Sequence, residues 1–263
     1  MEKKSQILEI LSDGSWHDRE QLSAQLGISG SELEAQLDSL RRSHPELRQV
    51  PELGVCLPRE PQHYDRRLLE ALAGGPVEVF DTIGSTNDAA RELFEQGAPH
   101  GAAALADQQT AGRGRMGRPF VSPSGTGIYV SVLLTAPAAL ENAHLVTPAA
   151  AVVTAGILER FTRAEIGIKW VNDLFCRGKK ISGILTEAVV REGKPAGIIV
   201  GTGINFATPP ELLPAEVAGS LREDLLPGAS RNEVAAAMVR EMRDTLAELV
   251  RSRGFLAEYR RRS

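Results

Sequence analysis

The feature that most constrains the fold is a series of strand-like runs, several of which follow one another without helical segments between them. The runs rich in Val, Ile, Leu or Ala cover residues 77–80, 102–106, 127–134, 166–170, 181–190 and 196–206. Successive strands without crossover helices pair antiparallel, because a parallel pair needs a long connection. The pattern therefore predicts an α+β fold with a mixed or antiparallel sheet, covered by a long helix over residues 143–161 and a helical C-terminal segment.

The first 60 residues show helical periodicity instead. Three short amphipathic segments follow one another: Asp18 is placed to cap the second helix, Gly27 ends it, and Ser29 opens the third. A hairpin-like segment at 49–57, with Pro and Gly at its turn, comes next. Three helices followed by a small β wing are typical of a winged helix-turn-helix.

A polar stretch with two prolines, residues 58–66, has the composition of a linker. We therefore predict two units, a winged helix-turn-helix domain over residues 1–62 and a larger domain over residues 63–263. A short connecting helix is expected at 68–73, directly after the linker.

Composition excludes several classes of protein. The formal net charge of −4 argues against a protein that coats nucleic acid through its overall charge. The two cysteines, Cys56 and Cys176, form no CxxC pair, so neither a disulfide framework nor a zinc site is indicated. The N-terminus lacks the apolar stretch of a signal peptide, and we predict a cytoplasmic protein without a membrane segment.

Residues 109–118, Gln-Thr-Ala-Gly-Arg-Gly-Arg-Met-Gly-Arg, carry the most informative motif. Three arginines alternate with three glycines. Guanidinium groups match phosphate and carboxylate oxygens, and glycines let backbone N–H groups turn towards an anion. The ordinary alternative is a solvated Arg/Gly loop or an RNA-contacting segment. On spacing alone, anion binding is favoured about two to one over that alternative.

A second motif comprises residues 169–174, Lys-Trp-Val-Asn-Asp-Leu, followed by Lys180 at the start of a strand. Asn172 and Asp173 could orient a nucleotide or a metal-bound phosphate, since oxygen ligands suit Mg²⁺. The ammonium of Lys180 could offset charge at phosphorus. Asn-Asp is also a common turn pair and lysine is usually solvated, so taken alone this motif favours the ordinary interpretation.

Two further segments are weak signals by themselves. The sequence Ser85-Thr86-Asn87 follows a strand and opens a helix, where Ser85 would serve as an N-cap and the group could also bind a small polar head. Residues 201–205, Gly-Thr-Gly-Ile-Asn, end a strand, and their glycines would permit the close approach of a flat ligand.

Together, in this order and spacing, the segments resemble the bacterial biotin protein ligases, including the bifunctional ligase that is also the biotin operon repressor. The family patterns GRGRxGR, KWPNDL and GxGIN correspond to residues 112–118, 169–174 and 201–205. The resemblance implies a class II synthetase-like α/β ligase domain behind the winged helix. It also implies an ATP-dependent enzyme, a biotin–[biotin carboxyl-carrier protein] ligase, that makes biotinyl-5'-AMP and transfers biotin to a lysine.

The resemblance also assigns residues. Those it would place around biotin are Ser85, Thr86, Asn87, Gln109, Arg113, Gly114, Arg115 and Lys180. Those it would place around ATP or the adenylate are Arg115, Arg118, Phe120, Asn172, Asp173 and Asn205. The catalytic candidates are Lys180, Arg115 and Arg113. No tightly bound metal is expected, only Mg²⁺ that enters with ATP near Asp173.

The implied partners are the biotin carboxyl carrier protein of acetyl-CoA carboxylase and a second copy of the chain in a homodimer. The implied site needs several cations because a carboxylate and a triphosphate repel each other unless positive groups offset both charges. Two alternatives remain: a biotin-sensing repressor with weak ligase activity, and a lipoate or octanoate ligase. The second would show an Arg-Arg run, Gly-Gly-Gly and a His-Asp pair, which the sequence lacks.

The chain departs from the family pattern at several positions. Phe120 replaces a larger aromatic residue, usually Trp, and would cover less adenine area. Val171 stands where the family has Pro, which restores a backbone donor. Where related ligases continue into an SH3-like domain, this sequence stops at Ser263, so we expect that domain to be lacking.

The third helix departs most. It carries Glu32, Glu34 and Asp38 where a DNA-reading helix has cations, and residues 1–60 hold seven Lys or Arg against eleven Asp or Glu, a balance of −4. A recognition helix without cations loses the counterion-release contribution to DNA affinity. We therefore expect binding to a biotin operator to be weak or lost.

Overall fold

The computed structural model describes residues 2–58, 63–214 and 216–263. The N-terminal unit contains α1 (Glu2–Leu11), α2 (Arg19–Leu26), α3 (Gly30–Arg41), β1 (Arg48–Val50) and β2 (Gly54–Cys56). As predicted, the Asp18 side chain accepts from the backbone N–H of Gln21 and the Ser29 hydroxyl from that of Glu32, while Gly27 ends α2 in the left-handed region. Each cap satisfies a backbone donor that the first helical turn leaves unpaired.

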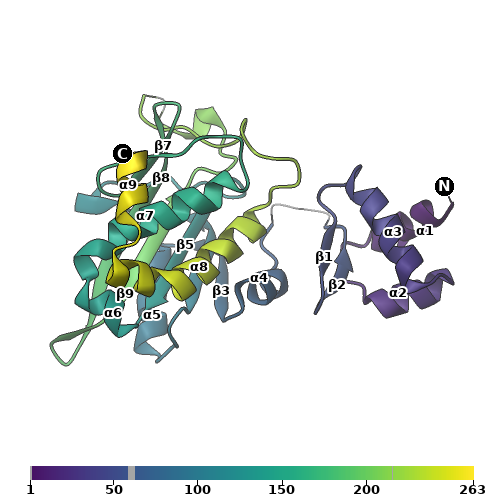
Figure 1. The fold of residues 1–263 in the computed structure, drawn as a ribbon, viewed down its shortest axis with the longest axis horizontal. Coiled ribbons are helices and arrows are strands. Elements are labelled where there is room, and N and C mark those ends of the chain that lie inside the picture. Colours follow the sequence, from purple (N-terminus) through teal and green to yellow (C-terminus); the bar gives the residue numbers. More distant parts are fainter. Residues whose placement is uncertain (1, 59–62, 215) are drawn as a thin grey trace.

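The helices of this unit pack around a small core of their own, to which β2 contributes. Its buried residues are Ile7, Leu11, Leu22, Leu26, Leu33, Leu37, Leu40, Leu47 and Val55. β1 and β2 pair antiparallel, and Figure 1 shows this hairpin between the three helices and the rest of the molecule. Residues 59–62 of the predicted linker lie outside the described residues.

The larger unit begins with a connecting helix, slightly longer than predicted, and continues through a seven-stranded sheet. Its helices are α4 (Arg66–Ala73), α5 (Thr86–Glu95), α6 (Pro137–Glu141), α7 (Ala143–Glu159), α8 (Arg231–Ser252) and α9 (Leu256–Arg262). Its strands are β3 (Val77–Ile83), β4 (Ala103–Gln109), β5 (Ile128–Leu134), β6 (Gly167–Lys169), β7 (Asp173–Cys176), β8 (Lys179–Arg191) and β9 (Lys194–Ile204). β7 and α6 were not predicted from the sequence.

The strand order is β3-β4-β5-β9-β8-β7-β6. β3 and β4 are parallel, because α5 connects them, and every other neighbouring pair is antiparallel. The mixed α+β architecture predicted from the sequence is therefore confirmed.

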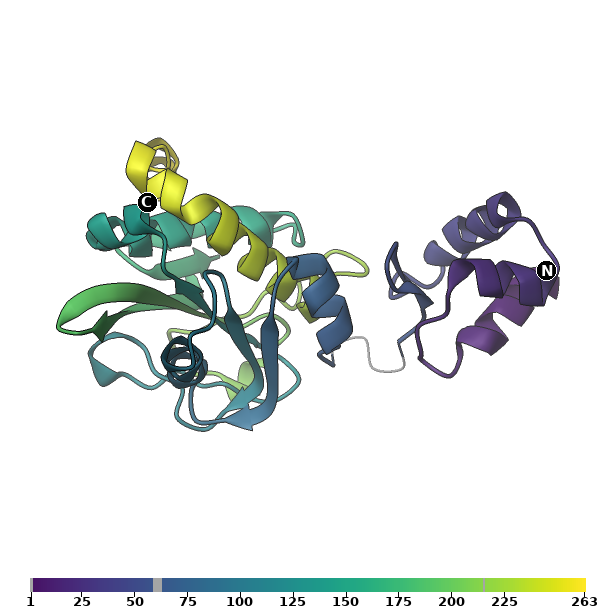
Figure 2. The same cartoon turned by 90° about the horizontal axis from the view of Figure 1, so that it is seen from below.

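The two faces of the sheet are covered very differently (Figures 1 and 2). Val130, Val132 and Leu134 of β5 point into the main core with α7 and α8. Leu133 of the same strand points to the other face, where a smaller core holds α5. Successive side chains of a strand point to opposite faces of the sheet, so both sets must be apolar where both faces are buried. Because α5 is short, loops cover the rest of this face of the sheet, and the candidate site lies there.

The N-terminus of α8 contacts both the sheet and the segment that precedes α4. Arg231 is fully buried: its Nη1 lies 2.6 Å from Asp107 Oδ1, its Nε donates to the carbonyl of Gly127 at 2.6 Å, and its guanidinium lies 4.3 Å from the Tyr64 ring centroid. Burial opposes ionisation of Asp107, but hydrogen bonds from Ser124 and Arg231 outweigh it and hold the pKa of Asp107 below its usual value.

Contacts also cross between the two units. Arg48 of β1 donates to the carbonyl of Gly228 at 3.2 Å, and the indole of Trp16 donates to Asp65 at 2.7 Å. Asp65 in turn caps α4 through the backbone N–H of Leu68. No helix among the described residues combines the length and the apolar character needed to cross a bilayer.

The buried Arg231 provides a stability test. We expect Arg231→Met to lower the free energy of unfolding by about 3–5 kcal/mol, because it leaves the Asp107 carboxylate without its cationic partner. The exposed pair of Arg251 with Glu248 is the control, and Arg251→Met should cost less than about 1 kcal/mol. Urea unfolding followed by circular dichroism measures both. Equal losses in the two variants would contradict this account.

Candidate functional site

The N-terminus of α5 forms one end of the site. β3 ends at Ile83, and Ser85 then caps α5 by accepting from the backbone N–H of Asn87 at 3.3 Å. Ser85, Thr86 and Asn87 are all buried. The helix-cap interpretation of Ser85 is therefore confirmed, and the cap places two more polar side chains beneath the loops of this face.

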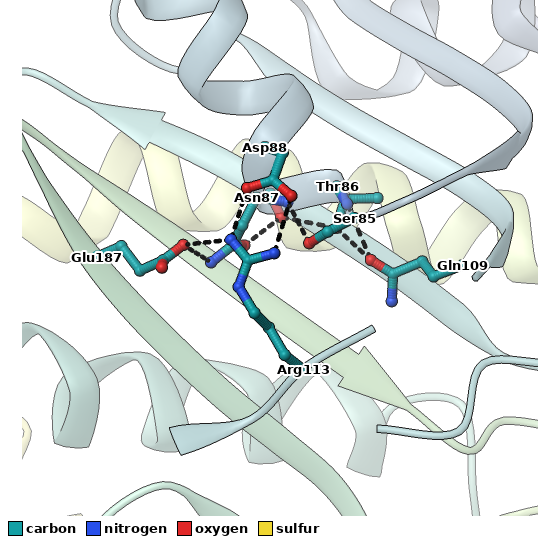
Figure 3. A network of polar contacts seen from close by, with 8 residues as sticks. Ser85, Thr86, Asn87, Asp88, Gln109, Arg113 and Glu187 are labelled. Atoms are coloured by element: carbon teal, nitrogen blue, oxygen red, sulfur yellow. Dashed lines mark hydrogen bonds and ion pairs between the residues drawn. The ribbon is translucent and has the colours of Figure 1, made fainter. Parts of the chain in front are cut away.

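Gln109, at the end of β4, binds to this helix end. Its Oε1 accepts from the Thr86 backbone N–H at 2.9 Å and from the Thr86 hydroxyl at 3.1 Å (Figure 3). Its Nε2 donates to the hydroxyl of Ser122 at 3.0 Å. The backbone contact determines which end of the Gln109 amide is the acceptor, because the Thr86 N–H can only donate.

Asn87 completes the group. Its Oδ1 accepts from the hydroxyl of Ser131 at 2.6 Å, and its Nδ2 donates to Glu187 at 2.7 Å. A Cβ at Gly201 would lie 2.0 Å from Asn87 Oδ1, so only glycine allows the amide to rest on β9. We call Ser85, Thr86, Asn87 and Gln109 the polar cradle.

The Arg/Gly loop, residues 110–120, folds back over this face. The backbone N–H of Phe120 donates to Gly112 at 2.8 Å, and that of Gly114 donates to Arg118 at 2.7 Å. At its tip Met116 has a φ of 58° and is 92% exposed. The loop is therefore held by its own backbone bonds, with an apolar side chain presented to solvent.

Arg113 does not extend into open space. Its guanidinium forms two hydrogen bonds with Asp88, at 2.8 and 2.6 Å, and its Nη2 lies 3.5 Å from Glu187 (Figure 3). The Arg113 hydrogen bonds hold the pKa of Asp88 below its usual value, and the same contacts raise the pKa of Arg113. The arginine thus joins the loop to α5 and β8.

The remaining cations lie on the neighbouring part of the face. Arg115 donates to Asn172 Oδ1 at 3.3 Å, and Asn172 donates to the carbonyl of Ile184 at 3.0 Å. Lys180 Nζ lies 2.6 Å from Asp173 Oδ1. Arg118 is exposed and forms no side-chain hydrogen bond or ion pair with any residue that the structure describes. These cations border a region that could receive an anion.

Phe120 lies between the cradle and the cations. Its ring is edge-on to Tyr129, with centroids 6.4 Å apart, and a Cβ at Gly203 would lie 2.5 Å from it. A Cβ at Gly183 would lie 3.2 Å from Lys180 Nζ and 3.6 Å from the Phe120 ring. Since Gly201 and Gly203 are two residues apart on one face of β9, the cradle and Phe120 are separated by about 7 Å.

Asn205 follows β9 and is buried. Its Nδ2 donates to the carbonyl of Gly219 at 2.9 Å, while Gly219 and Val217 form backbone bonds with Lys180. In this structure Asn205 therefore holds the segment next to Lys180.

Four residues of this arrangement were missed from the sequence: Asp88, Ser122, Ser131 and Glu187. Ser131 interrupts the apolar strand β5, and Glu187 interrupts β8. A buried polar residue needs a hydrogen-bond partner, so the fully buried Ser131 was a detectable signal, although the sequence does not show which residue it contacts. Chemically, the site combines a hydrogen-bonded group of uncharged side chains with an adjacent group of cations, which suits a neutral polar ring joined to an anion.

Comparisons with known proteins agree with this description. Residues 79–205 match the model of the biotin/lipoate A/B protein ligase family. The chain is 34% identical over 259 residues to the bifunctional ligase/repressor BirA of Escherichia coli, in an alignment that covers 96% of this chain and 78% of that protein. It is 32% identical to BirA of Bacillus subtilis, over 75% of this chain and 62% of that protein.

A solved structure is similar as well. The biotin protein ligase from Aquifex aeolicus, in complex with biotin and ATP, has a TM-score of 0.57 and 29% identity, over 70% of this chain and 76% of that one.

The close approach of the Asn87 amide to Gly201 can be tested by measuring the free energy of unfolding. Gly201→Ala places a methyl group against Asn87, and we expect it to lower the free energy of unfolding by about 1–3 kcal/mol. Gly156 lies inside α7 with no atom near its missing Cβ, so Gly156→Ala should be neutral or stabilising by up to about 1 kcal/mol. Urea unfolding measures both, and a stabilised Gly201→Ala variant would refute the close approach.

Proposed function

The chain belongs to the biotin protein ligase family, and on that premise we propose that it activates biotin with ATP and transfers it to a lysine of a biotin carboxyl carrier protein. The observation that carries the proposal is the juxtaposition of the uncharged polar cradle, whose Asn87 lies against Gly201 of β9, and the Lys180 cation on the neighbouring strand β8. Biotin has matching parts, a neutral ureido ring and a carboxylate at the end of an apolar chain.

We assign the ureido ring to the polar cradle. The ring offers one carbonyl acceptor and two N–H donors, and Ser85, Thr86, Asn87 and Gln109 supply hydroxyl and amide groups of both kinds. The orientation of the Gln109 and Asn87 amides is determined by their own partners, so the cradle is arranged before biotin enters. Preorganised hydrogen bonds cost less ordering on binding.

The cations serve the first chemical step. A biotin carboxylate oxygen attacks the α-phosphorus of ATP, an acyl–phosphate bond forms, and pyrophosphate leaves with the electrons of the broken P–O bond. Lys180, Arg115 and Arg118 offset the negative charge of the carboxylate and the phosphates, with Lys180 beside the carboxylate and α-phosphate. We assign Arg113 and Gly114 to the loop that shields the product from water.

Mg²⁺ would enter with ATP and neutralise part of the phosphate charge. Asp173 is the carboxylate we place near it, and because Asp173 already contacts Lys180, the phosphates and water would provide most of the ligands. Asn172 and Asp173 would border the nucleotide, Phe120 would lie against the adenine, and Asn205 would support the adjacent segment.

In the second step the lysine amine of the carrier protein attacks the acyl carbon, an amide bond forms, and AMP leaves with the electrons of the C–O bond. The amine loses its extra proton in the process. We also propose a homodimer formed through strands of the larger unit, since a free strand edge can pair with a second chain.

The N-terminal unit, which we place at residues 1–62 before a catalytic unit at 63–263, would be a winged helix-turn-helix. Its third helix is occupied by internal ion pairs: Glu34 pairs with Arg19 and accepts from Gln49, and Asp38 lies 3.3 Å from Arg41. These pairs leave little positive charge for phosphates. We therefore propose that this unit is a structural or interaction module with little affinity for an operator.

Lys180 provides the test of the chemical step. Lys180→Ala should slow biotin-dependent ATP–pyrophosphate exchange by about 100-fold or more, because one charge stabiliser of the transition state is lost. Lys194→Ala, at the exposed β8–β9 turn, is the charge-matched control. Avidin blotting of a carrier domain with biotin and MgATP measures the complete reaction, and lipoate or octanoate in place of biotin tests the acid. A Lys180→Ala variant with normal exchange would exclude the assigned role.

DNA binding is tested separately. With a duplex from its own biotin-operon promoter we expect a dissociation constant no tighter than about 1 μM at physiological salt, the range of non-specific binding. Glu32→Lys with Asp38→Lys should tighten non-specific binding, because it restores cations to α3. Fluorescence anisotropy at several salt concentrations measures both proteins. Nanomolar, salt-sensitive binding by the unmodified chain would overturn the proposal.

A further inference from the structure

Glu187 of β8 lies between the polar cradle and the Arg/Gly loop, and the proposed chemistry gives it no part. A single oxygen, Oε2, accepts from Asn87 Nδ2 at 2.7 Å and lies 3.5 Å from Arg113 Nη2 (Figure 3). We propose that Glu187 is a positioning residue that holds the cradle and the loop together, through Asn87 on one side and Arg113 on the other. The inference rests on the proposed ligase function.

The contact with Asn87 determines the orientation of a buried amide. Asn87 Oδ1 accepts from Ser131 and Nδ2 donates to Glu187. If the amide were reversed, its oxygen would face the Glu187 carboxylate, and two acceptors would meet without a proton. Asn87 is only 4% exposed and lies directly on Gly201, so water has little access to satisfy a reversed amide. Glu187 therefore selects one orientation.

The same orientation extends through the cradle. Because the Ser131 hydroxyl has one proton and Asn87 Oδ1 can only accept, that proton points to Asn87. The Thr86 hydroxyl, 2.8 Å from the Ser131 oxygen and 3.1 Å from Gln109 Oε1, then faces two acceptors with one proton and accepts none from Ser131. A charge on β8 thus controls hydrogen-bond directions at the N-terminus of α5.

The contact with Arg113 involves a second carboxylate. Asp88 binds the guanidinium through both oxygens, and its side chain is 53% exposed against 25% for Glu187. Exposed ion pairs are weakened by water and salt, whereas the less exposed Glu187 is screened less. Asp88 therefore ties the loop to α5, and Glu187 ties it to β8, next to the cradle.

The two contacts can be separated by substitution. Glu187→Leu removes both, and Glu187→Gln keeps an oxygen for Asn87 while removing the charge near Arg113. Asp88→Asn weakens only the Arg113 contact, because Asp88 bonds to no cradle side chain in the described ranges. Glu92→Gln, one turn along α5 and exposed, is the matched control for loss of a carboxylate on this helix.

Two measurements then distinguish the contributions, the KM for biotin in pyrophosphate exchange and the rate at which biotinyl adenylate dissociates. Glu187→Leu should raise the KM for biotin by about tenfold or more, with a smaller change in kcat, because the Asn87 amide loses its acceptor. It should also speed adenylate dissociation. Glu187→Gln and Asp88→Asn should speed dissociation while keeping the KM within about threefold. Glu92→Gln should change neither.

A Glu187→Leu variant whose KM for biotin matches that of Asp88→Asn would overturn the proposal, because Glu187 would then act on the loop alone. Should Glu187→Leu not fold, Asn87→Asp gives an independent test. That change sets two carboxylates against each other and should raise the KM, and adding Glu187→Gln should recover part of the loss by donating to Asp at position 87. A double variant no better than Asn87→Asp would also refute the role.

A measurement without substrate keeps this inference separate from the ligase proposal. Trypsin can cleave the loop after Arg113 and Arg115 where it opens, whereas the bond after Arg118 is protected by Pro119. In the substrate-free protein, cleavage within residues 112–118 should be faster in Glu187→Leu and Asp88→Asn than in the unmodified chain and in Glu92→Gln. Unchanged cleavage rates would refute the loop contact even if the enzyme proves active, and faster cleavage would support it even if biotin is not the substrate.

Discussion

Two glycines on the central strand β9, Gly201 and Gly203, are the constraint on which the site depends. Because Gly201 and Gly203 carry no side chain, the Asn87 amide and the Phe120 ring both reach the sheet backbone. A β-carbon at either position would overlap them. The period of two along a strand then sets the polar cradle and the Phe120 ring about 7 Å apart on one face. That separation determines which ligands can contact both.

Two of the cations at the site are already paired with carboxylates of the protein. Lys180 contacts Asp173, and Arg113 contacts Asp88 and Glu187, although all of these side chains are partly exposed. Ion pairs in such surroundings contribute about 1 kcal/mol or less. Substrate oxygens can therefore replace Asp173 at Lys180 at little cost, while Arg113, with two carboxylates, is held more firmly. This difference separates a cation available to the reaction from one that maintains the loop.

The opposite side of the sheet gives the site its rigidity. α7 and α8 pack on the main core, and buried Arg231 at the start of α8 binds Asp107 on β4, two residues before Gln109 of the cradle. Neighbouring contacts continue to the N-terminal unit through Asp65 and Trp16. The two units are thus joined by hydrogen bonds of known direction and do not depend on the linker alone.

The sequence by itself determined the local structure of this protein and the types of residue in its site. The caps at Asp18, Ser29 and Ser85, the locations of six of the seven strands of the large sheet and its mixed character follow from periodicity and from side chains that bond within three residues. Such contacts are short in sequence, so their pattern is visible there. The short strand β7 was not predicted from the sequence.

Only the tertiary structure decided which groups meet. Arg113 is paired with Asp88, 25 residues away, and Asn87 with Glu187, 100 residues away. These partners come together because β8 lies beside β9, across whose glycines the N-terminus of α5 rests. The sequence shows that a residue is charged or polar, but strand order and register decide which residue it contacts. Order and register in turn arise from the burial of the whole sheet between its helices.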